Sequence, residues 1–177
     1  MISHSSDKAV PKLVRPLDNT EALFAIMHSE LNGNTQVLTH ILIDKEIDFQ
    51  KLIHAVNVLF NKYQILRTCI IEKNDQLWFA EHDDFNRVLI SHSKAGNLSS
   101  AEDELQEELK KPINSSQNLW RMKLINILSL KQAMLIFVRN HAISDGYSTG
   151  LFFSLLLKAL SNNDAIKSLN STTEKIP

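Results

Sequence analysis

The sequence predicts an α+β fold, a two-layer sandwich in which helices pack on a largely antiparallel mixed sheet. Short β-branched and apolar segments alternate with amphipathic helical segments along the chain. Several of the strand-like segments are joined by short polar turns, as antiparallel neighbours require. The length of 177 residues and the 44% content of hydrophobic residues suit one globular domain.

Four segments carry helix signals. We expect helices from Asn19 to the Asn32-Gly33 break, after the N-cap Asp48, from a capping box at Ser99 to about Pro112, and from Tyr147 to Leu160. In the second of these, apolar residues from Leu52 to Phe60 form one stripe, which predicts burial against the sheet. The last helix is strongly apolar, so it either packs in the core or turns part of its surface toward an acyl group or a partner.

Six segments have the apolar and β-branched composition of strands. We expect these strands at residues 36–43, 65–71, 77–80, 87–91, 120–128 and 133–138. Residues 134–138 are continuously apolar, which predicts a strand that is buried on both faces.

The charge balance and the ends of the chain limit the function classes. Nineteen basic and twenty acidic residues leave a net charge of -1, without the basic excess of a nucleic-acid-binding protein. The single cysteine, Cys69, excludes an internal disulfide framework and fits a small core residue in a reducing compartment. No secretion signal and no apolar stretch of transmembrane length is present, so we expect a cytoplasmic protein.

Composition divides the chain into three parts. Residues 1–13 are polar and aperiodic and predict a flexible arm, and residues 14–161 contain all the periodic segments. Residues 162–177 are polar and end in proline, which predicts a linker or tail, as in a domain cut from a longer protein.

The loop that follows the apolar run at 134–138 concentrates polar residues. Asn140 and His141 come first, and Ser144, Asp145 and Gly146 lead into the last helix. A histidine at the end of a buried strand has little freedom, as a general base requires. Gly146 allows backbone angles that other residues avoid, so it favours a tight turn into the helix.

This loop resembles the His-His-x-x-x-Asp-Gly motif of the chloramphenicol acetyltransferase-like superfamily, which includes condensation domains, polyketide-associated acyltransferases and alcohol acetyltransferases. Four more segments resemble that family in order and spacing over residues 15–160. They are Arg15-Pro16-Leu17 with Glu21, Ile47-Asp48-Phe49 with Leu52 and Ala55, Tyr63 to Thr68, and Trp120-Arg121 with Leu124 and Ile125.

The resemblance implies the N-terminal lobe of an acyltransferase that moves an acyl group to an alcohol or amine. The donor would be the thioester of coenzyme A or of a phosphopantetheinyl carrier protein, and no metal or bound cofactor is implied. His141 matches the general base. Asp145 matches a structural aspartate that pairs with an arginine, here Arg67 or, as second choice, Arg15.

Other roles remain open at this point. Asn140 and Ser144 are candidate substrate contacts, and Arg67 and Gly146 are expected to support the site. Asn140 stands where the family has its first histidine, and an asparagine does not titrate near neutral pH.

The family also builds its tunnel between two lobes, whereas this chain offers one. We therefore expect a C-terminal lobe or self-association, and the alternative is a non-catalytic binding or assembly module that lacks a complete site. A hydrolase triad through Ser144 is disfavoured because no Gly-x-Ser-x-Gly elbow is present. The remaining histidines lack ligand spacing, so no metal site is expected.

Overall fold

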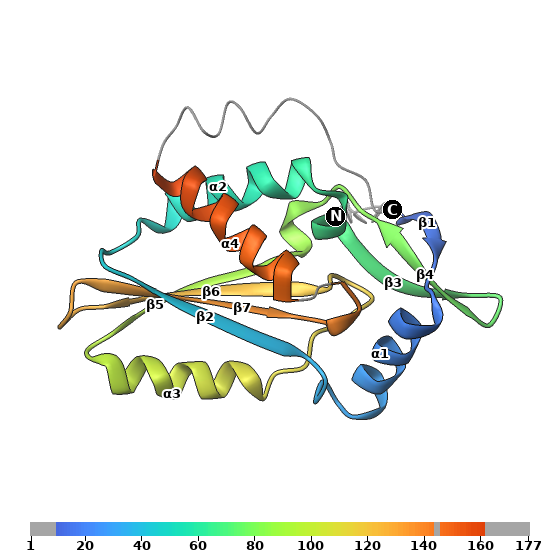
Figure 1. The fold of residues 1–177 in the computed structure, drawn as a ribbon, viewed down its shortest axis with the longest axis horizontal. Helices are drawn as coiled ribbons and strands as arrows, with labels where there is room; N and C mark the ends of the chain where they lie inside the picture. The colour runs from blue at the N-terminus through green and yellow to red at the C-terminus, as the bar shows by residue number, and fades with distance from the viewer. Residues whose placement is uncertain (1–9, 144–145, 162–177) are drawn as a thin grey trace, which may run out of the picture.

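A computed structural model describes residues 10–143 and 146–161 and contains two β-sheets (Figure 1). The smaller sheet is antiparallel, with the order β1 (Lys12–Pro16), β4 (Gln76–Glu81) and β3 (Thr68–Lys73). The larger sheet has the order β2 (Val37–Ile43), β7 (Gln132–Arg139), β6 (Trp120–Ile127) and β5 (Leu89–Ala95). Its β5–β6 pair is parallel and its other pairs are antiparallel, which confirms the mixed, largely antiparallel sheet.

Helices cover both faces of the larger sheet. Helices α2 (Phe49–Lys62) and α4 (Gly146–Ser161) lie on one face, and α3 (Leu98–Leu109) lies on the other (Figure 1). Helix α1 (Asn19–Glu30) packs beside the smaller sheet. The α+β class is confirmed, but α3 adds a layer to the two that the sequence predicts.

The main core fills the space between the α2–α4 layer and the larger sheet. The Leu52 and Leu59 side chains of α2 meet Trp120 and Phe137 of the inner strands, and all four are nearly or fully buried. A second cluster lies under α3, where Leu105 contacts the opposite face of the same strands. The inner strands β6 and β7 are therefore buried on both faces, which the apolar run at 134–138 predicts for β7.

Side-chain caps mark three helix starts, of which the start of α1 at Asn19 agrees with the prediction and the start of α3 at Leu98 differs from it. The N-cap of α1 is Asp18, whose carboxylate accepts hydrogen bonds from the backbone N–H groups of Thr20 and Glu21. The N-cap of α3 is Asn97, whose side chain accepts from the N–H of Ser100, so the capping box predicted at Ser99 does not form the cap. The predicted cap Asp48 is confirmed, since its carboxylate accepts from the N–H of Lys51.

Residues 65–67 are a helical turn instead of the beginning of a strand. They belong to the 3₁₀ turn η1 (Gln64–Arg67), and β3 begins only at Thr68. The indole N–H of Trp120 donates to the carbonyl of Leu66 at 2.9 Å, and the Arg67 guanidinium bonds the last carbonyls of α2. These contacts come from residues distant in sequence or from backbone groups, so local β propensity is overruled.

The predicted boundary of the N-terminal arm is also displaced. Strand β1 begins at Lys12, inside the predicted arm, and pairs with β4, and no strand was expected there. The predicted tail at 162–177 lies outside the described residues. Among the helices that the structure describes, none has both the length and the apolar character needed to cross a membrane.

Candidate functional site

The turn after β7 is fixed from within by Asn140. Its side chain is fully buried, and its amide N–H₂ donates to the Ser115 hydroxyl at 3.1 Å. Its amide oxygen accepts from the backbone N–H of Ala142 at 2.9 Å, and its own N–H donates to the Leu119 carbonyl. Asn140 is a predicted candidate for substrate contact, but in this geometry its amide is used inside the protein to hold the loop.

His141 opens the short 3₁₀ turn η3 (His141–Ile143), directly after the locked Asn140. Its ring stacks on Phe24 of α1, with 4.2 Å between ring centroids and an interplanar angle of 9°. The residue is partly exposed, so its own lobe does not enclose the imidazole. One flat face of the ring is therefore held by an aromatic partner while part of the side chain meets solvent.

The rest of the motif is only partly described. Ser144 and Asp145 lie outside the described residues, so their predicted roles remain predictions. Gly146 is the first residue of α4 and is exposed, and a Cβ placed there would meet no atom within 4 Å.

Arg67 is a buried residue with several partners. Its Nε and Nη2 donate to one carboxylate oxygen of Glu81, at 3.0 and 2.5 Å, and its Nη1 donates to the carbonyls of Phe60 and Asn61. Burial opposes ionisation of Glu81, but the hydrogen bonds from Gln64 and Arg67 outweigh it and lower the pKa of this carboxyl. Arg67 thus ties β4 to the C-terminal end of α2, while its predicted pair with Asp145 remains a prediction.

Arg15 is the alternative partner that the sequence suggested for Asp145. It forms a two-point ion pair with Glu21, at 2.7 and 2.9 Å, across the start of α1. The hydrogen bond from Arg15 lowers the pKa of Glu21 more than burial raises it. This pair fixes α1, and therefore Phe24, relative to the smaller sheet.

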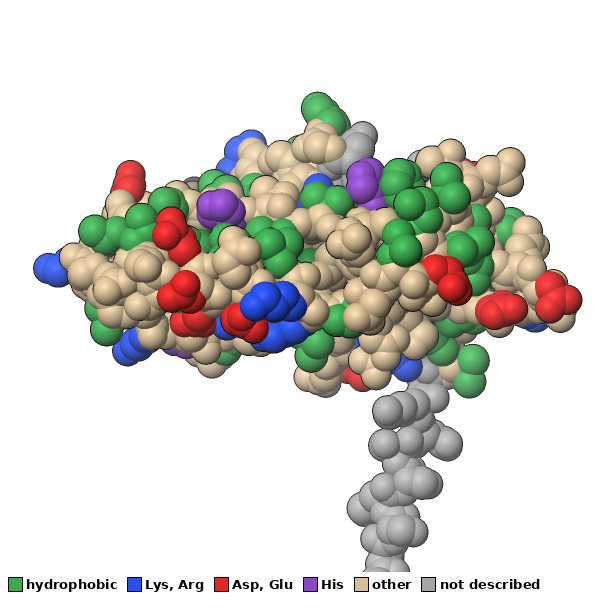
Figure 2. All heavy atoms as spheres, turned by 90° about the horizontal axis from the view of Figure 1, so that it is seen from below, with side chains coloured by type: hydrophobic (Ala, Val, Ile, Leu, Met, Phe, Trp, Pro, Cys, Tyr) green, Lys and Arg blue, Asp and Glu red, His purple; other side chains and the backbone are tan. Residues whose placement is uncertain are grey.

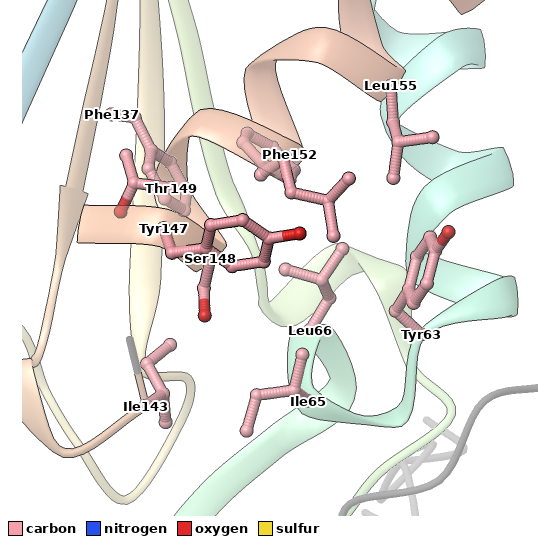
Figure 3. A pocket seen from close by; sticks show the side chains of 11 residues that line it. Tyr63, Ile65, Leu66, Phe137, Ile143, Tyr147, Ser148, Thr149, Phe152 and Leu155 are labelled. Carbon is pink, nitrogen blue, oxygen red and sulfur yellow. The ribbon is translucent and has the colours of Figure 1, made fainter. Parts of the chain in front are cut away.

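An apolar pocket of about 230 Å³ opens beside the motif turn (Figure 3). One wall is α4, with Phe152 and Leu155, and the other is the corner between α2 and η1, with Tyr63 and Leu66. Ile143 of η3 also lines the pocket and connects it to the turn that carries His141. The apolar residues of α4 were predicted, but the corner was not, because Ile65 and Leu66 read as strand residues.

A second apolar surface lies on α1. Its outward side chains Leu23, Ile26 and Met27 are spaced for one helix face, and they are 55%, 50% and 36% exposed. Figure 2 shows hydrophobic side chains gathered over this part of the molecule. Phe24 of the same helix contacts His141, so the apolar surface adjoins the candidate base.

The described residues contain no group of three or more histidine, cysteine or acidic side chains that could hold a metal ion. Cys69 is fully buried, and burial raises the pKa of its thiol, which favours the unreactive protonated form. Phe24 and Ser115 are the supporting residues that sequence reasoning missed. Both act through contacts with the motif from elsewhere in the chain, and no local pattern identifies such contacts.

Comparisons with known proteins give a family match. The family model described as "Condensation domain" matches residues 26–173. No curated protein matches the chain.

Solved structures of condensation domains are similar in fold. The first condensation domain of the calcium-dependent antibiotic synthetase, in complex with a substrate analogue, aligns with a TM-score of 0.72 at 16% identity, over 82% of this chain and 37% of that chain. A starter condensation domain of rhizomide synthetase in complex with C8-CoA gives 0.71 at 15% identity, over 82% and 34%. A four-domain nonribosomal peptide synthetase bound to AMP and glycine gives 0.70 at 19%, over 88% and 12%.

This chain therefore spans about a third of the length of the first two neighbours and 12% of the length of the third. The family match covers most of the chain, and the predicted resemblance to the chloramphenicol acetyltransferase-like superfamily is confirmed. The chain belongs to the condensation-domain family.

Proposed function

We propose that this chain is the N-terminal half of an acyltransferase that moves an acyl group from a thioester to an alcohol or amine. The donor is the thioester of coenzyme A or of a phosphopantetheinyl carrier protein. The observation that carries the proposal is the presentation of His141. The buried amide of Asn140 fixes its backbone, Phe24 supports its ring, and part of the side chain stays exposed.

His141 is the general base in this proposal. A ring nitrogen accepts the proton of the acceptor O–H or N–H while the acceptor's lone pair forms a bond to the thioester carbonyl carbon. The tetrahedral intermediate then collapses, the C–S bond breaks, and the thiolate leaves with the proton that the imidazolium returns. No redox step occurs and no metal is needed for the balance.

The other motif residues position His141. Asn140 takes the place of the first histidine of the motif and holds the turn by hydrogen bonds without a change of charge. Asp145 is assigned a structural role with an arginine partner, and Gly146 is assigned the entry to α4. Ser144 remains a candidate substrate contact.

The proposal also holds that residues 1–177 alone are not a competent enzyme. The reacting atoms must be held about 3–3.5 Å apart, which requires protein on both sides of His141. The described residues form one side. The exposed apolar surface on α1 beside His141 favours a covering element, either a C-terminal lobe or a second copy of the chain.

The test is an assay of thiol release from acyl-coenzyme A with a panel of alcohols and amines, with and without an added C-terminal half. Light scattering measures the oligomeric state in the same samples. We expect turnover only in the completed protein and its loss in His141→Ala, with His54→Ala as a matched histidine control outside the motif. Robust turnover by the monomeric 1–177 chain would contradict the proposal that this chain alone is not a competent enzyme. Turnover that survives His141→Ala would contradict the role of His141 as general base.

The second candidate is a non-catalytic condensation-like binding or assembly module. The position of Asn140 favours it, because the amide cannot replace a titrating histidine if the chemistry needs one. A completed protein that binds acyl-coenzyme A but releases no thiol with any acceptor would support this module over the enzyme.

A further inference from the structure

We propose that a small cavity between the loop joining α3 to β6 and the first residues of β5 and β6 binds a phosphate group. The inference does not depend on the proposed acyl transfer, because the cavity shares no lining residue with the apolar pocket and is not lined by His141. Three observations carry it: two arginines line the cavity, its available side-chain groups are hydrogen-bond donors, and its volume suits one small anion.

The cavity lies at one end of the larger sheet. Leu89 at the start of β5 and Arg121 at the start of β6 line it, and so does Arg87, the last residue of the 3₁₀ turn η2 (Phe85–Arg87). Most of the other lining residues belong to the loop that joins α3 to β6. Leu89 is 65% exposed, so the cavity opens to solvent on this side and a ligand can enter from there.

Arg87 is a cation without a countercharge in the described part of the chain. Among residues 10–143 and 146–161, no carboxylate forms an ion pair with its guanidinium and no group accepts a hydrogen bond from it. Its charge acts on its surroundings: burial is the main cause of the lowered pKa of His82, and the charge of Arg87 lowers this pKa further. An anion in the cavity supplies the countercharge that the described residues do not.

Arg121 adds a second guanidinium, from inside the fold. The residue is 7% exposed, and its Nε donates to a carboxylate oxygen of Glu108 at 3.0 Å, while its Nη2 donates to the Glu108 carbonyl. Its Nη1 has no acceptor among the described residues, so N–H groups of a buried cation remain without a partner there. Glu108 also accepts from Lys111 at 2.7 Å, so one carboxylate is shared by two cations and positive charge is left over.

The amide groups of the cavity are arranged for donation as well. The Asn114 side-chain oxygen accepts from the N–H and the hydroxyl of Ser116, so its N–H₂ is the group left available. Asn118 uses its oxygen toward His82 and its N–H₂ on the Trp120 carbonyl, so this amide holds the wall. None of the described residues that line the cavity is acidic. Positive charge and free donors without a competing carboxylate favour an anion.

The volume of the cavity matches a phosphate group. It measures about 90 Å³. An apolar cavity of about 150 Å³ holds the six carbons of benzene, so by proportion this cavity holds about four non-hydrogen atoms. The phosphorus and three oxygens of a phosphate fit that space, and the fourth oxygen, free or esterified, lies at the mouth. A phosphate offers more oxygens to several donors at once than a carboxylate, which has only two.

The experiment measures the binding of inorganic phosphate to the 1–177 chain by isothermal titration calorimetry, in chloride buffers of constant ionic strength. We expect saturable binding of one phosphate per chain and a much weaker affinity for acetate. Arg87→Met should weaken phosphate binding about tenfold or more, because it removes charge-assisted hydrogen bonds. Arg87→Lys should restore part of the affinity, because it returns the charge without the two-pronged donor geometry.

A matched pair of substitutions separates the cavity from the net charge. Gln117→Glu places a negative charge on an exposed lining residue and should abolish the binding. Gln106→Glu makes the same change on an exposed residue of α3 that does not line the cavity, and it should leave the affinity unchanged. Phosphate should also raise the melting temperature of the unmodified chain and of Gln106→Glu, but not that of Arg87→Met or Gln117→Glu.

The source of the phosphate is a separate arm of the same experiment. Coenzyme A carries a phosphomonoester that dephospho-coenzyme A lacks. Tighter binding of coenzyme A, with the difference lost in Arg87→Met, assigns the cavity to phosphomonoesters, whereas equal affinities beside intact binding of inorganic phosphate assign it to the free ion.

Three results would overturn the proposal. They are the absence of saturable phosphate binding, an affinity for acetate equal to that for phosphate, and equal affinities of Gln117→Glu and Gln106→Glu. Circular dichroism checks that each variant is folded. Because Gln117 is exposed, this pair keeps the test decisive even where the Arg87 variants fold poorly.

Discussion

Replacement of Arg67 by methionine should destabilise the protein more than any change in the exposed part of the motif. The methionine keeps much of the hydrocarbon volume but removes four hydrogen bonds, two to Glu81 and one each to the carbonyls of Phe60 and Asn61. Both members of the ion pair are largely enclosed, with side-chain exposures of 9% and 17%. The Glu81 carboxylate would therefore stay in the protein without its cation.

Loss of one partner of a buried pair costs about 3–5 kcal/mol. We expect the lower end of that range here, because Gln64 still donates to Glu81 at 2.6 Å and can stabilise part of the remaining charge. For a chain of this size, about 3 kcal/mol corresponds to a fall in melting temperature of roughly 6–12 °C. Urea unfolding of the 1–177 chain followed by circular dichroism measures the free energy directly.

The pH dependence gives a second check on the cause. In the unmodified protein the folded-state pKa of Glu81 is lowered from 4.5, so its stabilising contribution is present above pH 4.5 and is lost as the pH falls through the lowered pKa. Arg67→Met lacks that contribution, so the gap between the two proteins should narrow below pH 4.5. A cost below about 1 kcal/mol, as for an exposed ion pair, or a gap that does not change with pH would refute the reasoning.

Two further predictions concern Asn140 and His82. Asn140→Ala leaves the buried N–H of Ala142 without its acceptor, which should lower the free energy of unfolding in urea by about 1–3 kcal/mol and lower the turnover of the completed protein. Ser116→Ala is the control, because the Ser116 hydroxyl donates a hydrogen bond within its own exposed turn, and equal effects of the two substitutions would contradict the positioning role of Asn140. Burial lowers the pKa of His82 below 6.5, so the free energy of unfolding should fall as the pH drops from 6.5 to 5, before the carboxyl groups titrate. His82→Gln should flatten this part of the plot of stability against pH. A plot that stays steep in that variant would assign the loss of stability to another group.

The sequence determined the class of the fold and the place of the motif. The apolar run at 134–138 predicts a strand buried on both faces, and β7 is buried in this way because helices cover both sides of the sheet. The stripe that begins at Leu52 and the cap Asp48 likewise predict α2 with its buried face. These features depend on periodicity and on hydrogen bonds within one turn, which are local properties of the chain.

The tertiary structure decided which residues support the site. His141 is identified by its motif, but its stack on Phe24 brings together residues more than a hundred positions apart. Asn140 looks like a weak substitute for a histidine in the sequence, and only its contacts with Ser115 and Ala142 reveal a structural amide.

The corner between α2 and η1, which forms one wall of the pocket, was likewise decided by tertiary contacts. Ile65 and Leu66 have strand-like composition, yet Trp120 and Arg67 hold them in a turn that forms one wall. A strand preference is small and depends on its neighbours, whereas two buried hydrogen-bonding side chains fix the backbone outright. Contacts between segments that are distant in sequence therefore set the pocket, because no local pattern records which side chains will meet.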